Sequence, residues 1–285
     1  MKKLLSVVSV VAALTFGFAS CSSESSDNNL ALFMAMQKTN GSNSGQIVEN
    51  GQNSAPGANS LLSKVAEGTE VDLSGYTFDE KTALVVSKKL TVKGANLNGG
   101  SIIVDAPNVT LNGISNGSVM LSKNASSTKL VGLNNIKTLA VAGTENSRGT
   151  NQGTALLIEN SKIVNFVNLR TNLSVLIKDT TKFVTVTIKV ETALSAEDEN
   201  TSFGKINASA PVVLMGKAKV EAIITSENPS VKIASSSVVI EKKPETVKVE
   251  QATNSDLEDF VSVGVDGEET SAPEVDFDSS FSIEK

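Results

Sequence analysis

Five acidic residues lie among the strand-like segments of this chain, and most glycosidases cleave their substrates with carboxyl groups. They are Asp105, Glu159, Asp179, Glu191 and Glu221. Cleavage needs two such groups roughly 5 to 10 Å apart across a cleft. The five residues follow no constant spacing, so the sequence does not place two of them on one face of neighbouring strands. We therefore expect surface charges rather than a catalytic pair.

The chain contains no histidine and a single cysteine, which excludes several kinds of site. Without histidine, a Ser-His-Asp triad, a Cys-His pair or a histidine-bearing zinc site is impossible. One cysteine allows neither an internal disulfide nor a cysteine-cluster metal site. The acidic segments 266–269 and 276–279 lack the ligand spacing of a calcium loop. The sequence thus predicts no metal, no cofactor and no catalytic residues.

The net charge of −6 is concentrated near the end of the sequence. Residues 254–285 contain ten acidic residues and one lysine, and we expect 251–285 to form a disordered acidic tail. The middle of the chain is close to neutral, without a basic patch large enough to grip nucleic acid. The two arginines, Arg148 and Arg170, lie in or near predicted loops rather than in an acidic cluster.

Residues 1–20 have the layout of an export signal, in which Lys2 and Lys3 precede an apolar run and small residues follow it. The next residue is Cys21, which has no partner for a disulfide. A single acyl chain holds a protein to a membrane only marginally, whereas two or more anchor it stably. The alternative is a secreted protein with a free cysteine at its terminus.

The segment Phe18-Ala19-Ser20-Cys21 resembles a bacterial lipobox, from which it departs at Phe18, where leucine is usual. The resemblance covers about the first 21 residues. It implies that Cys21 is diacylated on sulfur, that the leader is cut before it and that the new amine is often acylated too. Ser22, rather than aspartate, follows the cysteine, as in lipoproteins sorted to the outer membrane.

Residues 21–60 are rich in Ser, Asn and Gly, a composition that buries too little apolar surface to fold. We expect a flexible tether, interrupted by the apolar island 30–36, which would lie on lipid, cap the fold or pack nowhere in particular. Residues 61–81 mix short apolar runs with turn residues and are our candidate for a terminal cap.

Short apolar segments of about three residues recur at nearly constant spacing from Thr82 onward. Leu90-Thr91-Val92 returns as Val109-Thr110-Leu111 and again as Leu130-Val131-Gly132, at steps of 19 and 21 residues. Bulkier triplets such as Ile102-Ile103-Val104 alternate with them. One such coil cannot bury its own apolar face and must stack on the next. The pattern predicts an all-β fold, a single-stranded parallel β-helix over residues 82–250.

Asn and Gly fall where the coils would turn, for example Asn112-Gly113 and Asn116-Gly117. They tolerate the left-handed backbone of tight corners, and stacked Asn side chains can hydrogen-bond from one turn to the next. Asn-Gly also suits two-residue hairpins, so an antiparallel fold is the competing interpretation. The short strand runs and the period favour parallel coils.

This pattern of short apolar segments and Asn or Gly turns resembles the right-handed parallel β-helix of pectate-lyase-like proteins, notably in Leu90-Thr91-Val92-Lys93-Gly94 and Val109-Thr110-Leu111-Asn112-Gly113. The resemblance spans roughly residues 65 to 250. Because that family contains enzymes, a polysaccharide-active lyase or hydrolase is the alternative function. The sequence favours a non-catalytic, lipid-anchored envelope protein, held by Cys21 and meeting an extended partner such as polysaccharide or host matrix protein.

Overall fold

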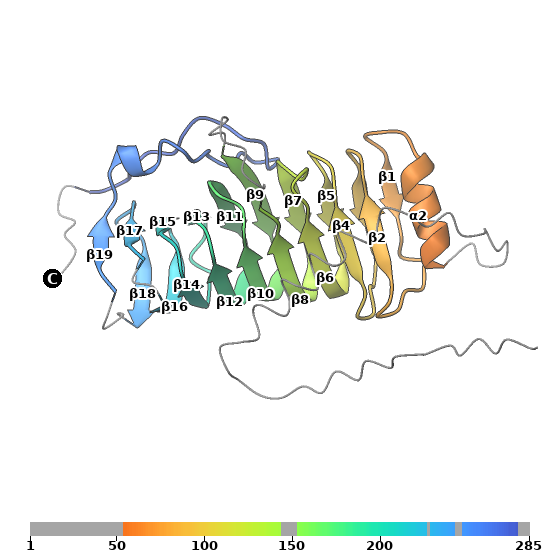
Figure 1. Cartoon of the computed structure of the whole chain (residues 1–285), viewed down its shortest axis with the longest axis horizontal. Helices are drawn as coiled ribbons and strands as arrows, with labels where there is room; N and C mark the ends of the chain where they lie inside the picture. The colour runs from red at the N-terminus through yellow and green to blue at the C-terminus, as the bar shows by residue number, and fades with distance from the viewer. Residues whose placement is uncertain (1–53, 144–152, 227–228, 243–246, 279–285) are drawn as a thin grey trace, which may run out of the picture. The chain divides into compact units, whose positions relative to one another are not determined.

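The computed structural model describes residues 54–143, 153–226, 229–242 and 247–278. They form a parallel β-solenoid of about nine turns, with one short helix at its beginning (Figure 1). The predicted all-β solenoid is confirmed, and the antiparallel alternative is wrong, because the strands of both sheets pair in parallel.

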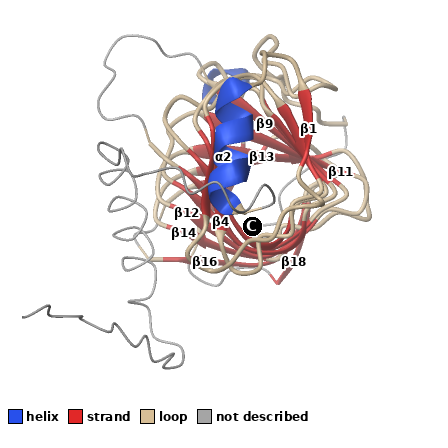
Figure 2. Ribbon diagram, turned by 90° about the vertical axis from the view of Figure 1, so that its right-hand side faces the viewer, coloured by secondary structure: helices blue, strands red, loops and turns tan. Residues whose placement is uncertain are grey.

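Each turn contributes one strand to each of two sheets, which enclose the core between them (Figure 2). Sheet A holds the ten odd-numbered strands: β1 (Glu70–Asp72), β3 (Thr91–Lys93), β5 (Thr110–Asn112), β7 (Thr128–Val131), β9 (Thr154–Glu159), β11 (Leu173–Lys178), β13 (Thr192–Ala196), β15 (Val212–Gly216), β17 (Val231–Ile233) and β19 (Val249–Gln251). Sheet B holds the nine even-numbered strands: β2 (Ala83–Val86), β4 (Ser101–Val104), β6 (Ser115–Leu121), β8 (Asn134–Val141), β10 (Lys162–Asn168), β12 (Lys182–Ile188), β14 (Lys205–Ala208), β16 (Lys219–Thr225) and β18 (Val239–Lys242).

The repeated apolar segments of the sequence stack directly on one another in the core. Val92, Leu111, Leu130 and Ile158 pair in register on adjacent strands of sheet A, and all four side chains are fully buried. Full burial of each such aliphatic side chain contributes about 1.5 to 3 kcal/mol relative to exposure. The column of β-branched and leucine residues therefore holds the turns in register.

Asparagine side chains form a ladder at one corner of the solenoid. Asn116 Nδ2 donates to Asn96 Oδ1 at 3.0 Å, and Asn135 Nδ2 donates to Asn116 Oδ1 at 2.8 Å. Asn116 and Asn135 both have φ of +54°, a left-handed conformation that asparagine tolerates better than most residues. The predicted hydrogen bonding between turns is confirmed at this corner.

The first turn is covered by helix α2 (Ala55–Lys64), whose Ala58 and Leu62 are buried against the core. Pro56 suits the first helical turn, where its missing N–H is not needed. The side chain of Asn59 occupies the free edge of strand β2: Nδ2 donates to Ala83 O at 2.8 Å, and Oδ1 accepts from Val85 N at 2.9 Å. Asn59 thus satisfies backbone groups that would otherwise pair with another chain.

Two predicted boundaries are wrong. The flexible tether was placed over residues 21–60, but α2 already begins at Ala55, because its buried apolar side chains offset the cost of ordering the segment. The cap was placed over 61–81, but β1 within it is the first rung of sheet A and pairs with β3. The solenoid therefore begins near residue 70 rather than 82.

The prediction of a disordered tail over 251–285 is wrong for residues 252–278, which we call the strap. It includes a 3₁₀ turn, η1 (Asn254–Asp256), and runs back over the outer face of sheet A. Leu257 and Phe260 are buried there against the side chains of Ala193, Val213 and Ala234. These apolar contacts stabilise a segment whose acidic composition alone predicts disorder.

The strap folds back on itself and returns along the solenoid. An antiparallel bridge joins Val263 to Glu269, and after this turn the strap comes back until Asp276 pairs with Ser235. Ser262 N donates to Ser271 O at 2.8 Å and closes the turn. The outer face of sheet A is thereby covered by the protein's own chain over several turns.

Several predictions fall on residues outside the described ranges. They are the export signal 1–20, the lipidation site Cys21, most of the tether with its apolar island 30–36, Arg148 and the last residues, 279–285.

Candidate functional site

The five candidate acids of the sequence each have a separate place in the solenoid. Glu159 forms an ion pair with Lys129 at 3.3 Å, and Glu221 forms one with Lys242 at 3.1 Å. Asp105 accepts hydrogen bonds from Ser122 Oγ and, at 3.0 Å, from Asn124 Nδ2. The carboxylates of these three residues are therefore occupied by contacts within the fold.

The other two acids lie at turns of the chain. Asp179 occupies a corner position with φ of +57°, and its backbone N–H donates to Asp198 Oδ2 at 2.8 Å. Glu191 is half-buried beside the strap, and burial raises the pKa of its carboxyl group. Lys232 opposes that rise, whereas Asp259 and Asp256 add to it. Within the described residues, no hydrogen bond or ion pair joins two of the five candidate acids.

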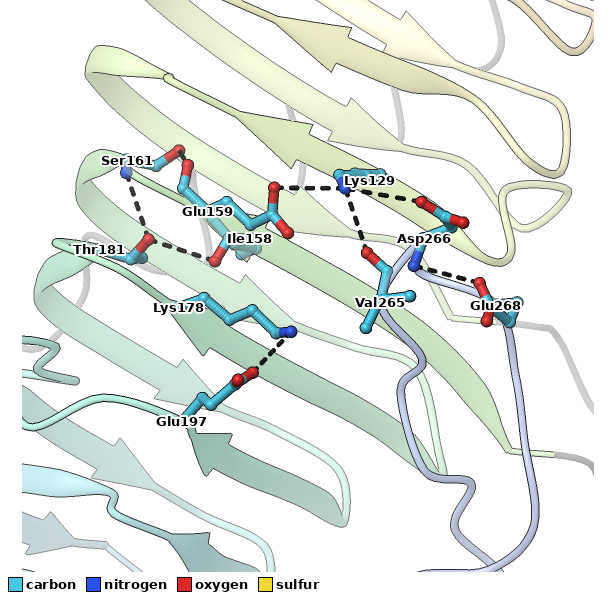
Figure 3. Close-up of polar contacts among 10 residues, drawn as sticks. All are labelled: Lys129, Ile158, Glu159, Ser161, Lys178, Thr181, Glu197, Val265, Asp266 and Glu268. Atoms are coloured by element: carbon cyan, nitrogen blue, oxygen red, sulfur yellow. Dashed lines mark hydrogen bonds and ion pairs between the residues drawn. The ribbon is translucent and has the colours of Figure 1, made fainter.

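Alternating charges follow one column of sheet A (Figure 3). Glu159 and Lys178 are in register on neighbouring strands, and Lys178 pairs with Glu197 at 2.6 Å. Lys129 reaches Glu159 and also donates to Val265 O of the strap at 3.1 Å. These charges, half-buried except for the exposed Glu197, therefore fasten the turns and the strap to one another.

A shallow depression of about 330 Å³ lies where the returning strap meets the ends of sheet A strands. Its polar side chains include Glu197, Lys217 and Asp276, with the hydroxyls of Ser195 and Ser235 between them. Gly216 forms part of the floor with φ of +57°, and a side chain there would collide with Ala196 O. The depression offers hydrogen-bonding groups of both charges to a small polar molecule or to one end of a larger one.

Asp276, which lines this depression, was considered from the sequence only as a calcium ligand and rejected, because the acidic tail was expected to be disordered and lacks the spacing of a calcium loop. Its place follows from the strap, since Asp276 N donates to Ala234 O at 2.7 Å. Within the described residues, no cluster of three or more acidic, histidine or cysteine side chains has the geometry of a metal site.

Arg170 has a structural environment that the sequence did not indicate. Its guanidinium donates from Nε to Ala142 O at 3.0 Å and from its two terminal nitrogens to Ala125 O and Ser122 O. Burial lowers the pKa of Arg170 to about 10, against the attraction of Glu269, so the side chain remains charged at neutral pH. Arg170 therefore serves three backbone carbonyls rather than a substrate.

Comparisons of the chain with protein-family models, with curated proteins and with solved structures find no match. Among the described helices, none is both long and apolar enough to span a bilayer. The similarity to lipoproteins and to pectate-lyase-like proteins stays a prediction from sequence, whereas the parallel solenoid itself is established by the fold.

Proposed function

We propose that this protein is a lipid-anchored component of a bacterial cell envelope, sorted to the outer membrane, whose solenoid serves adhesion or scaffolding without catalysis. The observation that carries the proposal is the order of the parts along the chain. A single cysteine follows an export leader, and a rigid solenoid begins only some tens of residues later. Two or three acyl chains on Cys21 would hold such a rod at the membrane.

The charged side chains support a non-catalytic role. The candidate acids Glu159 and Glu221 are engaged in ion pairs between turns, and Asp105 in hydrogen bonds, which is the arrangement of residues that stabilise a fold. A rigid solenoid roughly 40 Å long offers repeating polar side chains at about 4.8 Å intervals. Such a surface suits an extended partner, for example polysaccharide or host matrix protein.

Metabolic labelling with a fatty acid tests the anchor. Wild-type protein is expected to carry the label, and Cys21→Ala is expected to lose it while retaining the leader at its N-terminus. Label retained by Cys21→Ala would refute lipidation at this residue. Protease added to intact cells then separates the two scaffold roles, because a surface adhesin is cut and a protein facing the periplasm is protected.

The depression beside the strap favours a second candidate, a lyase or hydrolase acting on polysaccharide. Glu197, Asp276 and Lys217 line one concavity, and acid-base cleavage of a glycan there would require Glu197 to leave its ion pair with Lys178. Incubation with pectin-like and host glycans, followed by detection of released oligosaccharides, tests this activity. Product release by wild type and its loss in Glu197→Gln and Asp276→Asn would favour the enzyme over the scaffold.

A further inference from the structure

Sheet B carries a surplus of positive charge on its strands. The eight charged residues of its nine described strands are six lysines and two glutamates: Lys137, Lys162, Lys182, Lys205, Lys219, Lys242, Glu221 and Glu241. Glu241 pairs with Lys219 at 3.0 Å, and Glu221 pairs with Lys242 at 3.1 Å. The net charge of +4 on these strands therefore persists after the local ion pairs are formed.

Two of these lysines are stacked on adjacent turns without a counter-charge. Lys162 and Lys182 pair in register on β10 and β12, at the corner where earlier turns carry the asparagine ladder. Both are exposed, and in the described part of the chain neither forms an ion pair. Ammonium groups on strands about 4.8 Å apart repel each other, so this arrangement costs stability and an anionic partner would relieve it.

Exposed aliphatic side chains lie on the same sheet. Four of the five large apolar residues that are exposed in the described structure belong to sheet B strands: Val164, Val184, Ile224 and Val239. Val164 and Val184 follow Lys162 and Lys182 by two residues on the same strands and are 38% and 60% exposed. The surface thus combines apolar side chains with amines, rather than amines alone.

The other side of the solenoid has the opposite charge. The strap, which covers the outer face of sheet A, contains nine acidic residues and no lysine or arginine. The two sheets face each other across the core, so the basic and acidic surfaces lie on opposite sides of the rod (Figure 2). An anionic plane would attract the sheet B side and repel the strap side.

We propose that the outer surface of sheet B docks on an anionic lipid bilayer, with Lys162 and Lys182 at the headgroups and Val164 and Val184 inserted between them. Each lysine near an anionic membrane adds favourable electrostatic energy, and each aliphatic side chain gains by leaving water. The valines distinguish this occupant from a soluble polyanion, to which they would offer little. The biological purpose of the contact rests on the proposed envelope location, but the contact itself needs no acyl chain.

Vesicle sedimentation of the full chain tests this surface. Every protein carries Cys21→Ser, so that acylation cannot contribute and the leader contributes equally to all samples. Vesicles of phosphatidylcholine with phosphatidylglycerol are compared with vesicles of phosphatidylcholine alone. We expect K162S/K182S to bind the anionic vesicles roughly 30-fold more weakly than the parent, and we expect added salt to weaken the parent's binding.

Two further variants sharpen the result. V164S/V184S keeps both lysines and is expected to weaken binding to the anionic vesicles several-fold, because the inserted apolar contact is lost. K81S/K89S removes the same charge from exposed lysines outside sheet B and is expected to bind like the parent. Circular dichroism and thermal unfolding that match the parent confirm that each variant is folded.

Equal binding of K162S/K182S and K81S/K89S to anionic vesicles would overturn the proposal. So would binding of soluble polyglutamate that requires Lys162 and Lys182 while vesicle binding does not, because the surface would then serve an acidic polymer. Fatty-acid labelling at Cys21 is a separate measurement. A chain that is labelled but shows no difference between the vesicle variants would retain the proposed anchor and lose only this docking surface.

Discussion

Arg170 is a single buried side chain whose replacement should lower the free energy of unfolding of the solenoid substantially. It is almost fully buried, and its guanidinium serves the carbonyls of Ser122, Ala125 and Ala142, which belong to preceding turns. A buried carbonyl left without a donor loses free energy comparable to a lost hydrogen bond or more. One side chain thus fastens the backbone of the preceding turns.

Arg170→Met retains much of the aliphatic volume but none of the donors. We expect the free energy of unfolding to fall by roughly 3 kcal/mol, because three buried carbonyls lose their partners. The midpoint of thermal unfolding should then drop by roughly 6 to 12 °C. Lys89→Met, at an exposed position, is the matched control and should unfold like wild type. Equal midpoints for the two variants would show that Arg170 is dispensable.

Glu191 predicts a pH dependence of stability. Burial raises its pKa above the ordinary value of 4.5 in the folded state, so the ionised carboxylate is disfavoured there and stability is lost as pH rises through the folded-state pKa. Glu191→Gln avoids this loss. We expect the variant to be more stable than wild type at neutral pH, and the difference to vanish below about pH 4, where both side chains are neutral.

Urea midpoints at the two pH values measure this difference. Glu80→Gln, at an exposed turn, serves as the control and should not change the midpoint by a comparable amount. A stabilisation by Glu191→Gln that is the same at both pH values would contradict the explanation by ionisation.

The asparagine ladder at the corner separates two contributions to stability. Asn116 hydrogen-bonds to Asn96 and Asn135, and it also adopts φ of +54°. Asn116→Ala removes both hydrogen bonds and leaves a Cβ in the left-handed region without the local polar contacts that help asparagine adopt it, whereas Asn116→Gly removes the bonds and also the strain from the Cβ. We expect the alanine variant to be less stable than the glycine variant by about 1 kcal/mol, from chemical denaturation. Equal stabilities would mean that the backbone strain is negligible.

The strap is an element with its own local stability. Phe260 and Leu257 anchor it over Ala193, Val213 and Ala234, and Phe260→Ala removes the larger anchor. We expect protease to cut within 252–278 faster in this variant, because the strap opens more often, while the far-ultraviolet circular dichroism of the solenoid is retained.

Val265→Ala is the matched control for the strap, because Val265 lies on the same segment but is 65% exposed. It should be cut at the wild-type rate. Similar cutting of both variants and wild type would indicate that Phe260 does not hold the strap in place.

The elements differ in how far the sequence predicts them. The recurrence of Leu90-Thr91-Val92 as Val109-Thr110-Leu111 predicts the stacking of Val92 on Leu111. Every turn buries the same face, so apolar residues recur in the sequence at a nearly constant spacing. The strap has no such period. Its anchors Leu257 and Phe260 pack on Ala193, Val213 and Ala234, which lie about 20 residues apart in the sequence and meet only when β13, β15 and β17 stack in the folded solenoid.

The candidate site was predictable in part for the same reason. The sequence predicted surface charges at Glu159 and Glu221, since their spacing gives no common face, but it did not predict the ion pairs between turns that the two residues form. It could not indicate the depression that contains Asp276, because the strap's path over sheet A decides which side chains meet there. The strap contacts residues far from it in the sequence, and such contacts produce no local residue pattern from which they could be predicted.

At the scale of the whole molecule, one surface is basic and partly apolar, and the other is covered by an acidic strap. A rigid rod with this asymmetry would be oriented by any charged surface near its anchor. The proposed anchor at Cys21 decides whether such a surface is a membrane, so lipidation is the claim on which the biological interpretation rests.

The intact mass of the protein extracted from the membranes of its native cells tests this claim most directly. We expect a chain that begins at Cys21 and is heavier than its amino-acid sequence by the mass of a diacylglyceryl group, with or without a further acyl chain. A chain with unmodified Cys21, or one cleaved at another residue, would contradict it.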